Sequence, residues 1–361
     1  MSRPTRAVID RAAFVYNYRH AKSLAPDARA VAVVKANAYG HGAVALSRAL
    51  ADEADAFGVA CIEEAKELRA AGIHNDIVLL EGVFEPDELV DVDVEQFIQV
   101  VHAEHQLRWL LDHRPRRPYR VWLKLDSGMH RLGFDNEGFH SAYATLRDCA
   151  HVAELVPVTH FACADETDNA YTQRQLEVFR SATQGLANDF SVANSAATLG
   201  LPATRGGWIR PGIMLYGASP LGQANPSGDL LRPVMSLESA IIAIRDLAAG
   251  EAVGYGRRFI CERPMRVGVV AIGYGDGYPR HAEDGTPVAI DGVRSRVVGR
   301  VSMDMMTVDL SPVPDAHVGS VVELWGEQIL ANEVAWHADT IAYELFTGVT
   351  RRVPLTYREP A

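Results

Sequence analysis

The hydrophobic and polar positions between residues 30 and 212 form two alternating kinds of segment. Short runs that are apolar at successive positions are typical of strands buried under helices on both faces. Longer stretches with apolar residues three and four positions apart predict helices. Two such helices are expected over Ile62–Ala71, with Glu64 among its water-facing residues, and over Tyr171–Leu186. The expected strands are Ala30–Val34, Ala56–Ala60, Asp76–Leu80, Gln96–Val101, Arg120–Leu125, Val156–Ala162, Ser191–Asn194 and Gly207–Arg210.

Repeated strand–helix units of this kind favour an α/β fold in which a parallel sheet closes into a (β/α)₈ barrel of the TIM type. A doubly wound open sheet is the competing arrangement at this point. Near residue 230 the pattern changes to apolar segments separated by Gly, Pro and Asp turns, which predicts a mainly β region. The sequence therefore predicts a barrel over residues 1–230 and a mainly β C-terminal domain over residues 231–361.

The β-rich region contains one later stretch with helical spacing, Glu333–Leu345. Its expected strands are Ser236–Ile244, Met265–Ile272, Pro287–Ile290, Arg294–Val301, Met306–Leu310 and Val321–Trp325.

Composition narrows the class of protein. The chain has 361 residues and a net charge of −11, which disfavours binding to nucleic acid through phosphate contacts. The wide spacing of its four cysteines predicts neither a metal site nor a disulfide framework. The N-terminus lacks the apolar core of a signal peptide, and no apolar run approaches the ~20 residues needed to span a bilayer. We expect a cytoplasmic protein that binds neither membrane nor metal.

Lys35 follows the first apolar strand and precedes a turn that contains Gly40 and Gly42. An amine at the end of a buried strand is partly desolvated and is a candidate nucleophile or Schiff-base residue, although most such lysines are surface charges. Further polar residues stand at or just past other strand ends: Lys124, His160, Asn194 with Ser195, and Arg210. In a (β/α)₈ barrel, the carboxyl ends of all the strands meet at one mouth, where the chemistry occurs.

Three of these residues also have an ordinary structural explanation. Lys124 could form a salt bridge with Asp126 or another acid. His160 could be a hydrogen-bonded core residue, and Arg210 could cap a helix or lie on the surface. Their shared placement at the mouth favours a common site over three unrelated structural roles.

Two later segments are suited to bind an anion. Asn194–Ala197 places the Ser195 hydroxyl at the expected start of a helix, and Arg210–Ile213 offers backbone N–H groups in a turn at Gly212. Phosphate groups bind where such donors converge, often late in a barrel. A strand-end lysine together with a phosphate cradle suggests pyridoxal 5′-phosphate (PLP) held on Lys35 as an internal aldimine.

The segment Val33–Gly42 is similar to the PLP-lysine signature of the barrel-type, PLP-dependent alanine racemases. Further blocks match that family in order: Leu123–Gly133, Thr159–Glu166, Ala193–Ala197, Arg210–Tyr216, Val253–Phe259, Ala271–Arg280 and Gly299–Asp304. The chain thus resembles this family over nearly its full length. The resemblance implies an enzyme that interconverts L-alanine and D-alanine by moving the Cα proton.

Inversion at Cα requires acid–base groups on both faces of the substrate. The resemblance implies that these are Lys35 and Tyr255, the latter supplied by the partner subunit of a head-to-tail homodimer. Judged from its position between two glycines alone, Tyr255 would be a turn aromatic that packs on its own domain.

The resemblance also implies roles for other residues. Arg210 would face the pyridine nitrogen with His160 supporting it, and Arg131 would recognise the substrate carboxylate or a cofactor oxygen. Lys124 would be able to carry a carbamate that positions Arg131. Tyr39, Ser195, Gly212 and Ile213 would hold the phosphate. Met303 and Asp304, donated across the dimer, would line the substrate side, and the narrow entrance would be formed by Asp165, Tyr274, Arg280 and Arg300.

The chain departs from some members of that family at two positions. Arg351 stands where some have a tyrosine near the phosphate, and Ser302 replaces a cysteine. Because that tyrosine also bounds the substrate pocket, its loss could admit serine or a slightly larger side chain. A racemase of another small amino acid, a non-catalytic PLP-binding protein and a decarboxylase of basic amino acids remain as alternatives.

Overall fold

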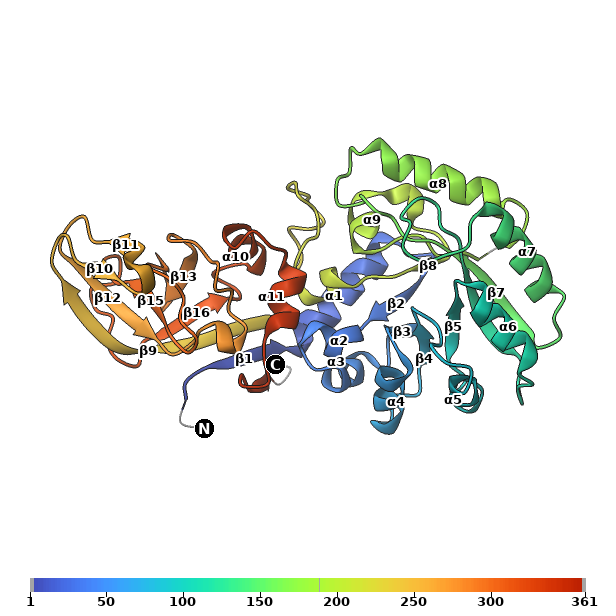
Figure 1. Cartoon of the computed structure of the whole chain (residues 1–361), viewed down its shortest axis with the longest axis horizontal. Coiled ribbons are helices and arrows are strands. Elements are labelled where there is room, and N and C mark those ends of the chain that lie inside the picture. The colour runs from blue at the N-terminus through green and yellow to red at the C-terminus, as the bar shows by residue number, and fades with distance from the viewer. Residues whose placement is uncertain (1–2, 188, 359–361) are drawn as a thin grey trace.

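The computed structural model describes residues 3–187 and 189–358. Residues 1–2, 188 and 359–361, which the two expected domains include, lie outside the described residues. The molecule is elongated, with a barrel at one end and a β-rich part at the other (Figure 1). The red helix α11 (Ala342–Gly348) lies at the junction of the two parts.

In the described residues, the barrel contains seven parallel strands in the order β7-β6-β5-β4-β3-β2-β8. The expected strand Ser191–Asn194 is reduced to two isolated parallel bridges, Val158–Ser191 and Asn194–Arg210. These bridges connect β7 to β8 and close the sheet, so the (β/α)₈ barrel is confirmed and the open sheet is excluded. The strands are β2 (Arg29–Val33), β3 (Ala56–Val59), β4 (Asp76–Leu79), β5 (Ile98–Val101), β6 (Tyr119–Lys124), β7 (Val152–Val158) and β8 (Trp208–Ile209).

The segment after Ser191 stays short because a helix begins at once. The Asn194 side chain accepts a hydrogen bond from the Ala197 N–H and caps α9 (Ser195–Gly200). Helices surround the barrel, and the two expected from the apolar spacing form α4 and α8. The remaining bounds are α1 (Arg11–Leu24), α2 (Lys35–Tyr39), α3 (Ala43–Leu50), α4 (Ile62–Ala70), α5 (Glu88–Glu95), α6 (Glu104–Asp112), α7 (Asn136–Arg147) and α8 (Ala170–Thr183).

The C-terminal part is mainly β, as predicted. Its single expected helix is divided into α10 (Ala331–His337) and α11, because Asp339 adopts a left-handed φ of +47° between them. The strands are β9 (Met235–Leu247), β10 (Ala252–Val253), β11 (Phe259–Ile260), β12 (Met265–Val270), β13 (Pro287–Ile290), β14 (Val293–Arg296), β15 (Met306–Asp309), β16 (Val321–Trp325) and β17 (Leu355–Arg358).

The first strand of the chain, β1 (Arg6–Asp10), belongs to this second sheet and not to the barrel. It pairs antiparallel to β9 and parallel to β17. This pairing corrects the assignment of the first residues to the barrel. The reason is visible in the strand, where Ala7 and Ile9 are buried and Val8 between them is only half-buried, a pattern that suits a sheet covered on one face.

His41 lies in the core where the two parts meet. Its ring is 4.7 Å from the Tyr216 ring and 4.9 Å from the Phe346 ring, between centroids. Complete burial lowers the pKa of His41 to about 4. The neutral imidazole is therefore favoured in the folded state, while the unfolded chain takes up a proton near pH 6.5.

Stability is consequently expected to fall as the pH drops through 6.5. From pH 7 to pH 5, His41 should remove about 2 kcal/mol from the free energy of unfolding. Urea unfolding at the two pH values measures this loss, and His41→Gln should reduce it by that amount. The matched control is His74→Gln, which makes the same substitution at an exposed histidine. An equal pH dependence in all three proteins would contradict the assignment.

Candidate active site

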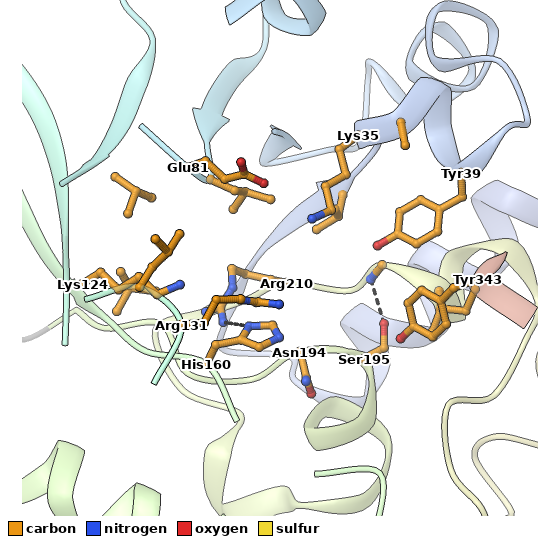
Figure 2. A pocket seen from close by; sticks show the side chains of 18 of the residues that line it. Lys35, Tyr39, Glu81, Lys124, Arg131, His160, Asn194, Ser195, Arg210 and Tyr343 are labelled. Atoms are coloured by element: carbon orange, nitrogen blue, oxygen red, sulfur yellow. Dashed lines mark hydrogen bonds between the residues drawn. The ribbon is translucent and has the colours of Figure 1, made fainter. Parts of the chain in front are cut away.

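A cavity of about 740 Å³ opens at the carboxyl ends of the barrel strands. It brings together the barrel residues that the sequence analysis singled out, although they come from different strands and turns. Figure 2 shows Lys35 extending between two groups, with Tyr39 and Ser195 on one side and Arg131 and His160 on the other. The predicted residues in the lining are Lys35, Tyr39, Lys124, Arg131, His160, Asn194, Ser195, Arg210, Gly212 and Ile213.

Lys35 is followed by a strained backbone turn. Ala36, Asn37, Ala38 and Tyr39 have φ values of +51° to +52°, a left-handed conformation that costs roughly 1–2 kcal/mol for each non-glycine residue. Glu64 supports this turn by accepting hydrogen bonds from the N–H groups of Ala36 (2.7 Å) and Ala60 (2.8 Å). The expectation that Glu64 simply faces water was therefore wrong. Such strain is typical of functional sites, and here it brings Tyr39 into the same cavity as Lys35.

One end of the cavity is formed by hydroxyl and backbone donors. The Ser195 Oγ accepts a hydrogen bond from the Gly212 N–H at 2.7 Å, which leaves the Ser195 proton to donate. Ile213 begins the 3₁₀ turn η2 (Ile213–Tyr216), whose first N–H groups have no acceptor within the turn. A Cβ at position 212 would lie 2.6 Å from the Tyr39 hydroxyl, so only glycine leaves room here. This end can hold a small anion.

Arg210 lies under the opposite side of the cavity and is 6% exposed. Its guanidinium donates hydrogen bonds to the Ser191 Oγ (2.6 Å) and the Thr159 carbonyl (2.8 Å), and it contacts the His160 Nδ1 at 3.2 Å. Burial lowers the pKa of Arg210 to about 10, so it remains protonated at neutral pH. Burial and the charge of Arg210 lower the pKa of His160 well below its usual value. His160 is therefore neutral, with Nδ1 as the acceptor.

The cavity has more cations than carboxylates although the chain as a whole is acidic. Lys35, Lys124, Arg131 and Arg210 line it, together with Glu81 and Glu344. Within the described residues, Lys124 forms no ion pair, and Asp126 instead accepts hydrogen bonds from the backbone and ring of His130. Burial and the charge of Arg210 lower the pKa of Lys124 to about 8. The pairing of Lys124 with Asp126, one of the structural explanations considered above, is therefore absent. The site attracts anionic ligands.

The sequence analysis missed several lining residues, among them Glu81, Trp122 and Tyr343. Glu81 and Trp122 come from the barrel, and Tyr343 comes from α11 of the β-rich part. The Tyr343 ring lies 5.8 Å from the Tyr39 ring, between centroids, and Figure 2 shows both beside Ser195. The placement of Glu81 just past an expected strand could have been noticed. The sequence offers no signal for Tyr343, because its position depends on how α11 docks against the barrel.

The expected residues of the second domain do not line this cavity. Tyr255 is 68% exposed, Met303 53% and Tyr274 37%. Strands β10 and β11, which flank Tyr255, lie at the end of the molecule remote from the barrel (Figure 1). Further predicted residues outside the lining are Asp165, Arg280, Arg300, Asp304 and Arg351. Of these, Asp165 lies close enough to Tyr343 that its charge, after burial, contributes to raising the pKa of that tyrosine.

In the part of the chain that the structure describes, none of the helices combines the length and the apolar character needed to span a bilayer. In the same ranges, 3–187 and 189–358, no group of three or more His, Cys, Asp or Glu side chains is arranged to hold a metal ion.

Two protein-family models match the chain, one over each of its two parts. The family model described as "Alanine racemase, N-terminal domain" matches residues 9–220, and that described as "Alanine racemase, C-terminal domain" matches residues 234–357. The chain belongs to the alanine racemase family. This membership confirms the resemblance drawn from the sequence blocks.

Individual alanine racemases match the chain along its length. It is 55% identical over 359 residues to the alanine racemase of Chromohalobacter salexigens and 53% identical over 357 residues to that of Pseudomonas syringae, covering 99% of both chains in each case. The crystal structure of the biosynthetic alanine racemase from Pseudomonas aeruginosa superimposes with a TM-score of 0.96 at 48% identity, covering 99% of this chain and 100% of that chain. Fold and domain order are thus those of alanine racemases.

Proposed function

We propose that this protein is a PLP-dependent alanine racemase that interconverts L-alanine and D-alanine. The observation that carries the proposal is the cavity in which the Lys35 amine, a buried guanidinium and an anion-binding turn converge. Membership of the alanine racemase family supports the same reaction.

The donor set fits PLP at three points. Lys35 supplies the amine that would bond to its aldehyde carbon. The glycine at position 212 leaves room for the Tyr39 hydroxyl, and the hydroxyls of Tyr39 and Ser195 with the Ile213 N–H would hold the phosphate of PLP. Arg210 would hold the ring nitrogen. When bound to the substrate amine, PLP withdraws electrons from Cα and so makes the Cα proton removable.

Two residues of this chain would move that proton. The Lys35 Nζ would take or return a proton on one face of Cα. The Tyr255 Oη does the same on the opposite face, so that inversion results. Because Tyr255 lies far from the cavity of its own chain, it would reach the cavity of a second copy in a head-to-tail homodimer.

The Arg210 guanidinium keeps its proton at neutral pH and transfers none to the ring nitrogen it would hold. Electron withdrawal from Cα is thereby limited, which favours return of the proton to Cα over transamination. His160 supports this role because its Nδ1 accepts from Arg210 and fixes the guanidinium plane.

Arg131, an exposed cation in the lining of the cavity, would bind the substrate carboxylate. Lys124, with its pKa lowered to about 8, is neutral in about a tenth of the molecules at pH 7 and could react with carbon dioxide to form a carbamate. That carbamate would convert one of four crowded cations into an anion that pairs with Arg131. Met303 and Asp304 of the second copy would complete the substrate side, and the entrance would be bounded by Asp165, Tyr274, Arg280 and Arg300.

The test is racemisation by the purified protein with added PLP. L-Alanine should be converted to D-alanine, with a kcat/KM about tenfold or more above that for L-serine. Visible spectra before and after adding L-alanine report whether the cofactor engages the substrate. A better kcat/KM with serine would shift the proposal to another small-amino-acid racemase. PLP binding without proton exchange, or carbon dioxide release from lysine or ornithine, would contradict it.

A further inference from the structure

An ion-pair network centred on one buried carboxylate holds together two loops of the β-rich part. Its centre is Asp276, which is 0% exposed. Arg3 binds both carboxylate oxygens, at 2.5 and 2.6 Å, and Arg352 lies 3.4 Å from one of them. The same carboxylate accepts a hydrogen bond from the Gly273 N–H at 3.0 Å, and Arg352 extends the network to Asp304 at 2.5 Å.

The network fixes loop 273–277 against loop 302–304. The Tyr274 N–H donates to the Ser302 carbonyl at 3.0 Å, and the Gly275 N–H donates to the Met303 carbonyl at 2.8 Å. A Cβ at Gly273 would lie 2.2 Å from the Ser302 carbonyl oxygen, so the two backbones approach as closely as glycine allows. The two loops therefore form one unit.

An ionised, buried carboxylate contributes less to the free energy of folding than its contacts alone suggest. Desolvation of a buried charge disfavours folding, and apolar packing often stabilises equally well. Burial alone would raise the pKa of Asp276, but the hydrogen bonds from Arg3 and Gly273 outweigh it and lower the pKa. Asp276 therefore stays ionised. Its bidentate contact with Arg3 fixes the orientation of the two side chains as well as the distance between them.

We propose that Asp276 is a positioning residue for the active site of the other subunit. Through Arg3 and Arg352 it fixes the joined loops that present Tyr274, Met303 and Asp304 to the neighbouring cavity. This inference rests on the proposed function, because those side chains meet substrate only in a shared-site dimer. The N-terminal segment of one chain thereby shapes a site in the other.

The first test is the kinetics of Asp276→Asn. We expect kcat/KM for alanine to fall about 10- to 100-fold, because small displacements of substrate-contacting groups are costly. The dissociation constant for PLP and the mass of the dimer should not change, since the residues proposed to hold PLP belong to the barrel. Arg3→Gln, at a side chain that is 32% exposed, should give a smaller loss in the same direction. The matched control is Arg6→Gln, which breaks an exposed pair with Glu238.

The second test asks whether Asp276 acts on the active site of the other subunit or on that of its own. Asp276→Asn is mixed with Lys35→Ala and allowed to form mixed dimers. One site then has an intact Lys35 and faces an intact Asp276 from the other chain, so its kcat/KM should return to the unmodified value. Arg3→Gln in place of Asp276→Asn provides the same reading should the asparagine variant fail to fold.

Three results would overturn the inference. One is an Asp276→Asn protein with unchanged kcat/KM, and another is a loss that mixed dimers do not restore. In either case an unmodified protein that racemises alanine leaves the proposed function standing. The third is an unmodified protein that does not racemise alanine, which contradicts the proposed function and the positioning role together.

Discussion

Replacing Lys35 with alanine is expected to lower kcat for alanine racemisation by about 10³-fold or more. The variant loses both the amine that would bond PLP and the base on one face of Cα. The visible absorbance of lysine-bound PLP should disappear, whereas noncovalent PLP binding should persist because Tyr39, Ser195 and Gly212 are untouched. A coupled assay for D-alanine and a PLP titration measure the two effects.

Lys66→Ala is the matched control for Lys35→Ala. It removes an exposed lysine that pairs with Asp91 on the surface of the barrel, and kcat should not change. Added small amines should partly restore proton exchange in the Lys35→Ala protein, because they can enter the space left by the side chain. A Lys35→Ala protein that keeps most of its activity would refute the assignment of the base.

Replacing Tyr255 with phenylalanine is expected to lower kcat by about 10²- to 10⁴-fold, the usual contribution of a positioned acid–base group. The substitution removes one hydroxyl from a side chain that is 68% exposed in the single chain, so folding and PLP binding should be unaffected. Only one face of Cα then has a base. In deuterated water, exchange starting from L-alanine should be lost more completely than exchange starting from D-alanine, with little inversion.

Tyr16→Phe is the corresponding control. Tyr16 lies beneath the Arg232 guanidinium, 3.6 Å from the ring centroid, and does not line the cavity. Its loss of a hydroxyl should leave both exchange rates unchanged. Equal losses from the two enantiomers in Tyr255→Phe would argue against separate bases on the two faces.

The barrel was predictable because its strands are apolar on both faces. Ala56–Val59 and Ile98–Val101 are buried at every position, which only a sheet covered on both sides requires. Because the carboxyl ends of all barrel strands meet at one mouth, Lys35, Lys124 and Arg210 could be predicted to lie together there. Backbone periodicity alone supplied this much of the site.

Other features depend on contacts that no local pattern encodes. The left-handed turn after Lys35 has an alanine-rich sequence, and it is held in place partly by Glu64 from a different helix. Tyr343 reaches the cavity through the docking of α11. Asp276, in a glycine-rich stretch typical of an exposed turn, is completely buried by Arg3 from the start of the chain. Tertiary structure overrides the local preference in each case.

The role of Tyr255, which lies far from the cavity of its own chain, follows only from the resemblance to the alanine racemase family. A tyrosine between Gly254 and Gly256 gives no sign of chemistry, and in the single chain it contacts no part of the barrel mouth. In the proposed dimer, the role of Tyr255 depends on where the second subunit lies, and a single chain does not specify that position.

Mixing Lys35→Ala with Tyr255→Phe tests the shared two-base site most directly. Each variant alone should be nearly inactive in racemising alanine. In a mixed dimer, one site has Lys35 from the Tyr255→Phe chain and Tyr255 from the Lys35→Ala chain, so it should turn over like an unmodified site. Activity that rises in proportion to the mixed dimers, separated by differently charged tags, is the predicted result. Mixed dimers no more active than the two variants alone would contradict the account.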